Sequence, residues 1–578
     1  MRAILFFKLI NLFYFKGSFK FYFLFVLSLI AGLFEYIGLI LIYQFVLFLS
    51  NPNSIYCKKI ITFFNENFDI VSFSKISLLL GIAVASVYIF KNLYMLFFVK
   101  FNNQVLQDLS VKITKKLVRI FLFQDFVKIN NLSKEEKINI LSKNEFVVWQ
   151  YCYKFINLVA NCAIVLIIIS FLFIKFTLCA LIAVFFISIL AFVEYGYLKK
   201  HSTYQNKHFS SCFDDFNSIL IKTVDLIKEI RLNNKQELFI DKIEKRALEY
   251  SILNNNRSFC SIFHIYFTEI SIMIAFVVVL GALFYTTNFD NQLLITSIST
   301  ICVIILRLAP LINRAQSCLY AINSNKAPVK ELIRFASDFN IKDNIKSTKE
   351  IMPFENTIEL QNVGFSYDEN GECLQNINLK INQGEFIGIV GESGCFKTTL
   401  ALIISGLIKP NEGKILVDGK TIKEDNLLKW QNNIAFLAQD YRILFNEHEN
   451  LKNDYLEKMG LCIEKLDFEK LSCGQKQRFA LANILSVNKK VLILDEATSA
   501  CDVVSQEKIS DILNGLKGEK TIISIAHRLQ FIKNCDKVIF MEKGKIIDID
   551  SFSNLNEKYE KFREIVNLSN FEIEKDES

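Results

Sequence analysis

The chain has 578 residues, of which 52% are hydrophobic, 13% aromatic and 22% charged, and its mean hydropathy is +0.30. This composition excludes a disordered, collagenous or repetitive chain and is unusual for a soluble enzyme of this length. The net charge of +7 comes from basic residues in loops between apolar runs, so we expect a membrane protein and no nucleic-acid partner. The fourteen cysteines include no C-x-x-C pair, which argues against a disulfide framework or a zinc site.

Apolar segments dominate the first 330 residues, and six of them are long enough to cross a bilayer. They cover residues 21–49, 76–99, 155–174, 176–197, 262–285 and 293–319. The long connections 100–150 and 198–258 are rich in lysine and arginine, which predicts that they and both termini face the cytoplasm. Their helical periodicity predicts that the spanning helices continue into the cytoplasm. Residues 4–15 are interpreted as an interfacial helix, and residues 50–73 as an external amphipathic helix or a packed loop.

Charged side chains inside the apolar segments are costly and are therefore candidates for function. They are Glu35, Lys91, His264, Glu269, Arg307 and Arg314. Arg307 and Arg314 are seven residues apart, so they share one helix face, and Pro310 between them predicts a kink. Such a ladder of basic groups suits an anionic head group. In the alternative interpretation these charges pair with one another or reach a helix end. The alternative is favoured over a functional role for Lys91 and His264.

A polar linker at 336–356 separates the predicted membrane domain, 1–335, from a second domain at 357–578. There, a strand at 385–390 leads into a glycine-rich loop and then a helix at 400–407. Strand, loop and helix of this kind bind phosphates through loop N–H groups, with Lys397 on the β- and γ-phosphates and Thr398 on Mg²⁺. The nucleotide-binding candidates in this loop are Gly391, Ser393, Gly394, Cys395, Phe396, Lys397, Thr398 and Thr399.

Two further motifs accompany this loop. Residues 471–478, LSCGQKQR, resemble the LSGGQ signature, and residues 491–499, VLILDEATS, resemble the Walker B motif of ATP-binding cassette (ABC) proteins. The other elements of that family occur in the expected order. Tyr367 resembles its adenine-stacking tyrosine, Gln439 its Q-loop glutamine and His527 its switch histidine, while residues 499–502 resemble the D-loop.

The resemblance implies an ATPase in which two cassettes sandwich two ATP molecules, each held by one chain's Walker A loop and the other chain's signature. The chain would then act as a homodimer or as a heterodimer with another half-transporter. Glu496 would polarise the attacking water and His527 would contact the γ-phosphate. The resemblance further implies Mg²⁺ contacts from Thr398, Gln439 and Asp495, with Gln439 also catalytic, and nucleotide contacts from Tyr367, Ser472, Gly474 and Gln475.

Across its whole length the chain resembles an ABC exporter half-transporter. This implies a polytopic α-helical membrane domain of six transmembrane helices with long cytoplasmic extensions, followed by an α/β P-loop NTPase domain. The glutamate in the first helix, the external segment and the arginines of residues 306–314 resemble those of bacterial lipid-linked oligosaccharide flippases. That resemblance implies the bacterial inner membrane and an amphipathic, lipid-linked, anionic substrate, with Lys91, Arg307 and Arg314 near its pyrophosphate. A peptide exporter or another lipid exporter is the main alternative.

Three departures from the family pattern concern ATP chemistry. Phe396 replaces a glycine of the Walker A loop, where an unusual φ would cost on the order of 1–3 kcal/mol. Cys473 replaces the first signature glycine, and the segment between Gln439 and Leu471 is shorter than exporters usually carry. The sequence therefore leaves two hypotheses. One is a working ATP-driven exporter, and the other is a catalytically weak or inactive subunit that regulates a heterodimer.

Overall fold

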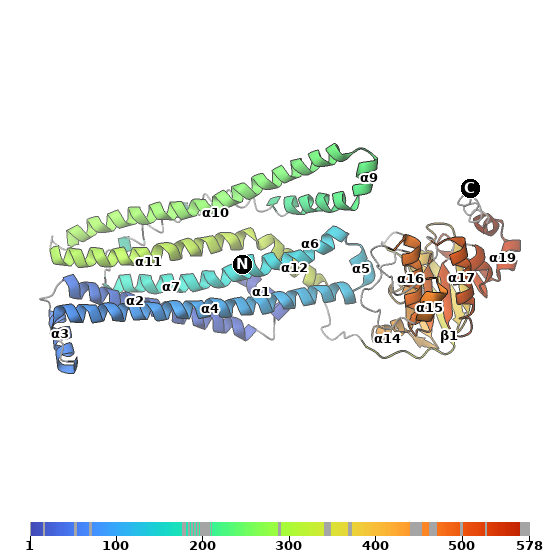
Figure 1. Cartoon of the computed structure of the whole chain (residues 1–578), viewed down its shortest axis with the longest axis horizontal. Helices are drawn as coiled ribbons and strands as arrows, with labels where there is room; N and C mark the ends of the chain where they lie inside the picture. The colour runs from blue at the N-terminus through green and yellow to red at the C-terminus, as the bar shows by residue number, and fades with distance from the viewer. Residues whose placement is uncertain are drawn as a thin grey trace. The chain divides into compact units, whose positions relative to one another are not determined.

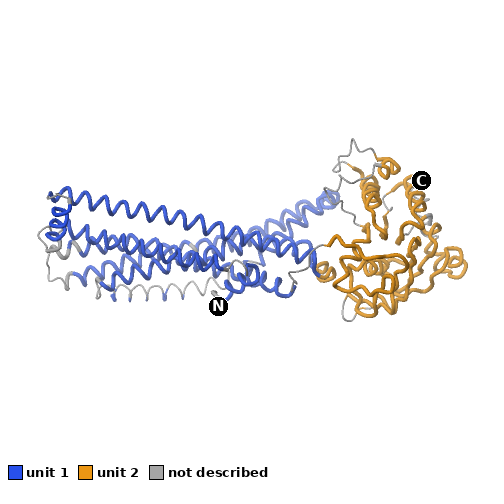
Figure 2. Tube along the Cα trace, turned by 90° about the horizontal axis from the view of Figure 1, so that it is seen from below, with its two compact units in different colours: residues 1–124, 132–341 blue, residues 125–131, 342–578 orange. Residues whose placement is uncertain are grey.

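The computed structural model describes most of the chain. The described residues are 2–14, 18–50, 55–68, 72–175, single positions between 181 and 209, 211–286, 291–339, 348–367, 371, 373–439, 453–461, 471–497, 501–525 and 529–566. They divide into two compact units, residues 1–124 with 132–341 and residues 125–131 with 342–578, which Figure 2 shows in two colours. The longer segment of the second unit begins at Lys342, within the predicted linker, 336–356.

Long helices make up the first unit (Figure 1). They are α1 (Arg2–Tyr14), α2 (Ser18–Ser50), α3 (Ile55–Phe68), α4 (Phe73–Phe123), α6 (Lys134–Glu145), α7 (Tyr153–Lys175), α9 (Ile227–Leu232), α10 (Gln236–Thr286), α11 (Asn291–Ser324) and α12 (Lys326–Asp338). A π-helical turn, Phe146–Cys152, joins α6 to α7. Residues 211–225 are also helical. The helices at 2–14 and 55–68 correspond to the two short helices predicted from the sequence.

Five helices in the described part of the chain are long and apolar enough to cross a membrane. These are Phe19–Leu49, Phe73–Phe123, Lys134–Ile174, Gln236–Leu283 and Ser297–Ser324. Five of the six predicted segments coincide with them, and the helices α4 and α10 extend far beyond the predicted spans, as the periodicity of the loops indicated. The remaining predicted segment, 176–197, lies mainly outside the described residues.

Apolar side chains of three helices form the centre of the bundle. Ala31 and Leu39 of α2 pack with Ile164 and Phe171 of α7 and with Ile304 of α11. At one end of α2 and α4, Phe48, Cys57 and Ile76 form a smaller cluster that fixes α3. The packing therefore brings α2, α4, α7 and α11 together. Of the charged residues predicted for the membrane domain, α2, α4 and α11 carry Glu35, Lys91, Arg307 and Arg314, whereas His264 and Glu269 lie on α10.

Two sheets organise the second unit. The strands are β1 (Thr357–Phe365), β2 (Leu374–Asn382), β3 (Phe386–Gly391), β4 (Glu412–Val417), β5 (Lys420–Thr421), β6 (Ile434–Leu437), β7 (Val491–Asp495), β8 (Thr521–Ile525), β9 (Lys537–Glu542) and β10 (Lys545–Asp550). An antiparallel sheet has the order β2-β1-β4-β5, and a six-stranded sheet has the order β10-β9-β3-β8-β7-β6. Strands β9, β3, β8, β7 and β6 are parallel, so their carboxyl ends meet at one edge, where ligands bind in such sheets.

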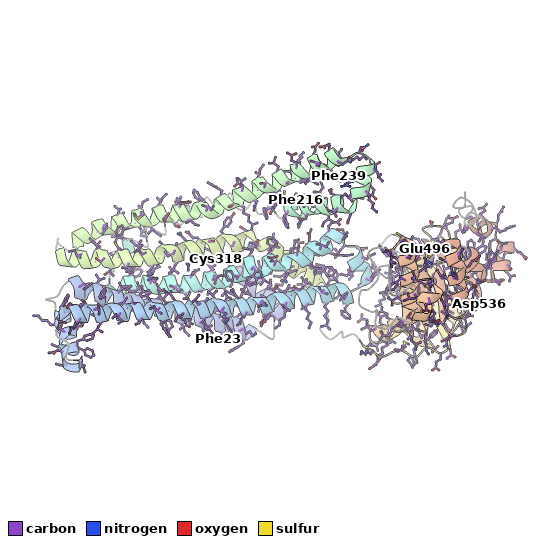
Figure 3. The ribbon with its side chains drawn as sticks, in the orientation of Figure 1. Phe23, Phe216, Phe239, Cys318, Glu496 and Asp536 are labelled. Carbon is purple, nitrogen blue, oxygen red and sulfur yellow. The ribbon has the colours of Figure 1, made fainter. Side chains whose placement is uncertain are left out.

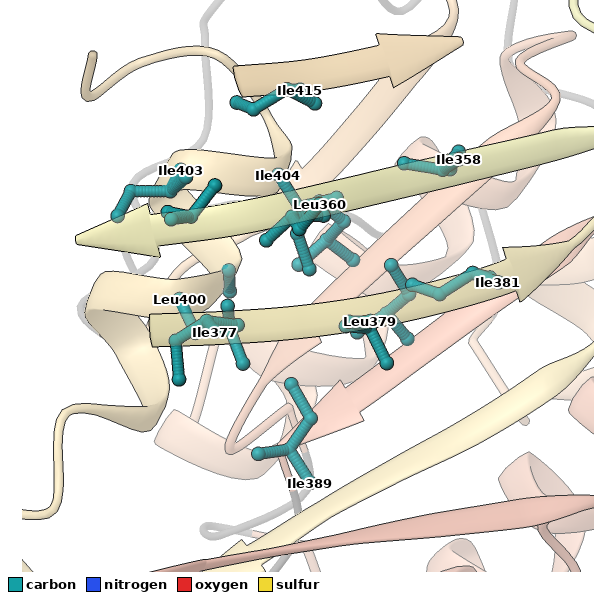
Figure 4. Packing of buried hydrophobic residues seen from close by; sticks show 14 of the residues in the cluster. Ile358, Leu360, Ile377, Leu379, Ile381, Ile389, Leu400, Ile403, Ile404 and Ile415 are labelled. Atoms are coloured by element: carbon teal, nitrogen blue, oxygen red, sulfur yellow. The ribbon is translucent and has the colours of Figure 1, made fainter. Parts of the chain in front are cut away.

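Helices complete the second unit. They are α5 (Phe126–Asn130), α13 (Lys397–Ile404), α14 (Leu427–Gln431), α15 (Asn453–Lys458), α16 (Cys473–Ser486), α17 (Val503–Asn514), α18 (Leu529–Lys533) and α19 (Phe552–Lys558). Helix α13 lies between the sheets, where Leu400, Ile403 and Ile404 pack with strand residues such as Leu360 and Ile389 (Figure 4). Val127 of α5 packs against the same core.

Candidate ATP site and membrane charge cluster

The predicted phosphate loop connects β3 to α13. Gly391 ends the strand, and a Cβ there would lie 2.3 Å from the carbonyl oxygen of Met541 and 2.6 Å from the Cys395 sulfur. Only glycine therefore fits at this position. Lys397 is buried and donates hydrogen bonds to the carbonyl oxygens of Gly391 at 2.8 Å and Glu392 at 2.9 Å. The loop thus closes around its own lysine, and Ser393 and Gly394 are exposed at its surface.

Phe396 occupies the left-handed region of the backbone, with φ of 70° and ψ of 31°. A glycine adopts this conformation without steric cost, whereas a side chain costs about 1–2 kcal/mol. The ring is half-buried against the core of the domain, and the backbone has a positive φ that a glycine would accept. Helix α13 begins directly afterwards at Lys397, three residues before the predicted helix start.

Hard oxygen ligands for a magnesium ion meet beside this loop. The Thr398 hydroxyl donates a hydrogen bond of 2.9 Å to Oδ2 of Asp495, and Asp495 is buried at the end of β7. Mg²⁺ prefers such oxygen atoms and commonly takes one or two protein ligands together with phosphate oxygens and waters. The two residues therefore fit the predicted metal site. Gln439, the third predicted ligand, points its side-chain nitrogen to Glu496 at 2.8 Å.

Glu496 lies directly after β7 and is labelled in Figure 3. Its backbone has a positive φ of 50°, and hydrogen bonds hold it there. The Glu496 N–H donates to the Ile525 carbonyl at 3.1 Å, the Glu496 carbonyl accepts from Nε2 of Gln477 at 3.2 Å, and the carboxylate accepts from Gln439. The side chain expected to polarise the attacking water is thereby fixed beside Asp495.

Gln477 belongs to this site although the sequence analysis did not single it out. It lies on α16, is 1% exposed, and bonds the backbone of Glu496 as described above. Its Oε1 accepts a hydrogen bond of 3.4 Å from the sulfur of Cys501, in the D-loop region. The signal in the sequence was its position within LSCGQKQR, where its role is indirect because the side chain supports Glu496 rather than a ligand.

The predicted signature residues form the start of α16. The Ser472 oxygen accepts a hydrogen bond from the Gln475 N–H at 3.3 Å, and Gln475 Oε1 accepts from the Ser472 N–H at 2.9 Å. This is a capping box. Gly474 and Cys473 occupy the first turn, with Cys473 exposed. The helix N-terminus, which favours negative charge, is therefore rigidly presented at the surface.

Tyr367 and Cys395 lie near the same loop. The Tyr367 hydroxyl is 3.2 Å from Oγ1 of Thr399, and its ring packs edge-on against Phe365. Tyr367 is 41% exposed, so part of the residue is accessible to a nucleotide base. Burial raises the pKa of the Cys395 thiol, which keeps it protonated and unreactive. The predicted switch histidine, His527, lies outside the described residues.

Three of the charged residues predicted in the membrane domain meet inside the bundle. Glu35 of α2 forms ion pairs with Lys91 of α4 and with Nε of Arg307 of α11, the latter at 3.8 Å. The Arg307 guanidinium also lies over the Tyr88 ring, 4.3 Å from its centroid. The alternative interpretation was that these charges pair with one another. The structure shows this arrangement for Lys91 and Arg307, which both pair with Glu35.

Arg314 lies on the same helix as Arg307 and is exposed. Pro310 lies between them inside α11, which continues through it. His264 is part of α10, and its side chain lies outside the described residues. The structure thus brings two of the four substrate candidates together.

Comparisons with known proteins identify the ATPase unit. The family described as "ABC transporter" matches residues 374–499. The energy-coupling factor transporter ATP-binding protein EcfA1 of Mycoplasmoides gallisepticum is 31% identical over 212 residues, which are 33% of this chain and 76% of that protein. The chain belongs to the ABC transporter family. The predicted fold class is confirmed, and the matched segment contains the Walker A and Walker B motifs of this ABC protein.

Two other relatives each match about two fifths of this ABC protein. An ATP-dependent lipid A-core flippase of Desulfotalea psychrophila is 35% identical over 242 residues, 37% of this chain and 41% of that protein. P-glycoprotein 14 of Caenorhabditis elegans is 32% identical over 256 residues, 40% of this chain and 19% of its own length. The chain therefore spans less than half of the length of these two relatives.

A solved structure extends the likeness to the membrane unit. The structure of a bacterial Atm1-family ABC exporter with ATP bound has a TM-score of 0.73, covers 95% of this chain and 98% of its own, and is 16% identical. At this identity the likeness shows the fold alone, a helical domain followed by an α/β ABC domain.

Proposed function

We propose that this chain is one half of an ATP-driven exporter that moves an amphipathic, anionic substrate across a bilayer. The observation that carries the proposal is the geometry around Asp495: a Mg²⁺-binding pair with Thr398, and Glu496 held beside it by hydrogen bonds. Relatives described as a lipid A-core flippase and as a β-(1→2)glucan export protein support an exported lipid or glycan. A lipid-linked oligosaccharide, which combines both, is the leading candidate substrate.

The ATPase unit would work by positioning and charge stabilisation. Thr398 and Asp495 would hold Mg²⁺, which neutralises phosphate charge when bound. Lys397 would leave its loop carbonyls for the β- and γ-phosphates, and Glu496 would accept a proton from water as it attacks. Ser472, Gly474 and Gln475 would close on the nucleotide of a second subunit, identical or not, and His527 and Tyr367 would contact phosphate and adenine.

The membrane unit would supply the route for the substrate. Lys91, Arg307 and Arg314 lie on helices within the bundle and would attract a phosphate or pyrophosphate head group, with His264 as a further candidate. We place the chain in the bacterial inner membrane with both termini in the cytoplasm, because the basic connections 100–150 and 198–258 would then face inwards. The long extensions of α4 and α10 would link substrate movement to ATP hydrolysis.

Phe396 favours a second candidate function, a catalytically weak subunit that regulates a heterodimer. Its left-handed backbone carries a cost that a glycine would not. The exporter proposal is nevertheless stronger, because the Thr398–Asp495 hydrogen bond and the hydrogen bonds that hold Glu496 support a working ATP site.

Transport by the purified full-length chain tests the proposal. Proteoliposomes are loaded with a fluorescent lipid-linked oligosaccharide, and its movement between leaflets is followed with ATP and with a non-hydrolysable ATP analogue. If the chain is an exporter, we expect the lipid to move between leaflets with ATP but not with the non-hydrolysable analogue. Absence of movement, combined with restored movement when a second half-transporter is reconstituted with it, would instead support the regulatory subunit.

A further inference from the structure

The charge cluster in the membrane unit contains a feature that substrate binding alone does not explain. Glu35 is 2% exposed, and its carboxylate contacts both Lys91 and Arg307. A buried carboxylate with two basic partners is strongly held, since removing either charge leaves the other unpaired in a medium of low dielectric constant. Glu35 therefore already neutralises the two basic groups in part.

The two basic partners are not equivalent. The Lys91 side chain is 13% exposed, whereas that of Arg307 is 38% exposed. Arg307 approaches Glu35 at 3.8 Å, beyond hydrogen-bond length, and a guanidinium has five N–H donors. Lys91 is thus the close partner of Glu35, and Arg307 keeps donors and open surface for another anion.

The surroundings of Arg307 hold its guanidinium in place. Its plane lies over the Tyr88 ring, and this ring packs on α2 because Gly38 has no side chain. A Cβ at Gly38 would be 3.0 Å from Cζ of Tyr88. Cation–π contact and packing therefore fix Arg307 next to Glu35 while part of its side chain remains exposed.

The cluster also carries positive charge in excess, since two basic groups share one carboxylate and Arg314 acts on Lys91 as a further positive charge. An anion that binds Arg307 reduces this excess and meets no second carboxylate among the described partners. A cationic head group would have to displace Lys91 from its buried partner, and a neutral one would leave the excess charge unbalanced. The arrangement consequently favours an anionic ligand, and Arg307 is the residue of the cluster that this ligand would contact.

We propose that Glu35 is an internal counter-ion that holds Lys91 and Arg307 together in the empty transporter and gives Arg307 over to the anionic head group of the substrate. Glu35 is then a positioning residue. This inference rests on the proposed export of an anionic amphiphile and deepens it: the site is kept assembled between transport cycles by a carboxylate that takes the place of the substrate's own anionic group.

The test measures melting temperatures of the full-length chain in dodecyl maltoside, with and without dodecyl phosphate. Glu35→Gln removes the charge and should lower the melting temperature by about 5 °C. Dodecyl phosphate should then raise the melting temperature of Glu35→Gln by at least twice as many degrees as that of the wild type, because it replaces the missing counter-ion. Glu269→Gln is the control, since Glu269 is an exposed acid of α10 for which no ion pair is described, and it should respond like the wild type.

A shorter carboxylate provides the second variant. Glu35→Asp keeps the charge but draws it away from Arg307, so it should melt near the wild type and still respond more strongly to dodecyl phosphate. This variant decides the matter if Glu35→Gln does not fold. Inorganic phosphate replaces dodecyl phosphate in a parallel series, and an equal response would support the inference with a free anion as sufficient ligand.

Equal shifts in the wild type and both Glu35 variants would overturn the inference. The result is separable from the proposed function, because melting requires neither ATP nor transport. If the protein shows these shifts but moves no lipid-linked oligosaccharide, the counter-ion role of Glu35 stands and the proposed export function fails. If it moves the lipid-linked oligosaccharide but shows no difference in the shifts, the export function stands and the counter-ion role fails.

Discussion

The ATP site and the membrane cluster both place charged groups out of water, but they hold them differently. Around Asp495 and Glu496 the side chains are tied to backbone and to residues of short motifs, as in the bond from Gln477 to the Glu496 carbonyl. Glu35, Lys91 and Arg307 come from three separate helices and hold one another. The first arrangement suits chemistry that needs fixed positions, whereas the second can exchange partners when helices or ligands move.

The largest expected effect concerns the membrane side of this comparison. Replacing Arg307 and Arg314 together by alanine removes two charged hydrogen-bond donors for the head group, each worth about 1.5–3 kcal/mol. We expect flux of an anionic lipid-linked substrate per ATP hydrolysed to fall by about 100-fold or more. Undiminished flux in proteoliposomes would contradict the role assigned to these arginines.

A smaller effect is expected at the support of Glu496. Gln477→Leu keeps side-chain bulk but removes the N–H that bonds the Glu496 carbonyl. We expect kcat for ATP to fall by about tenfold, with KM little changed, because positioning and not binding is lost. Ser486→Ala, at the far end of α16, is the control and should leave both constants unchanged. A change in KM alone would show that Gln477 acts on nucleotide binding.

Phe396 separates the effects of backbone and side chain. Phe396→Gly relieves a left-handed residue at a cost of about 1–2 kcal/mol, so nucleotide affinity, measured by titration of a fluorescent ATP analogue, should rise by roughly tenfold. Phe396→Ala removes the ring but keeps the Cβ, and it should remain close to the wild type. Equal affinities for all three proteins would show that the strain does not reach the nucleotide.

The smallest predicted effect is a pH dependence in the helix 211–225 of the first unit. Asp214, on the helix 211–225, has its pKa raised mainly by burial, although Lys143 at 3.6 Å opposes the shift. The folded state then binds this proton more tightly than the unfolded state, so stability falls as pH rises from about 4 through the raised pKa. Melting temperatures of Asp214→Asn should lack this decline. Parallel pH curves for the two proteins would rule it out.

The ATP site was readable from the sequence because its residues lie in local motifs. Thr398 and Asp495 are brought together by two strands of one parallel sheet and the loops that follow them, a geometry that the motifs themselves imply. Phe396 was recognised as a strained position for the same reason, since its place in the loop defines its φ. Gln477 was missed because it acts through the backbone carbonyl of Glu496, a contact that its position within LSCGQKQR does not reveal.

For the membrane cluster, the sequence predicted only two alternatives, in which the charges bind a substrate or pair with one another. Each charge was visible as an exception in an apolar segment, but whether Lys91 meets Glu35 depends on how α2 and α4 pack. That packing rests on contacts such as Gly38 against Tyr88, which periodicity does not reveal. The pairing of Glu35 with two basic residues at once was therefore a finding of the structure.

ATP hydrolysis by the full-length chain tests the central claim most directly. We expect the site around Glu496 to hydrolyse ATP although Phe396 lies in the neighbouring phosphate loop. In lipid vesicles the wild type should hydrolyse ATP at least about 100-fold faster than Glu496→Gln, with equal binding of a fluorescent ATP analogue by both proteins. Hydrolysis by the wild type no faster than that of Glu496→Gln would contradict the account.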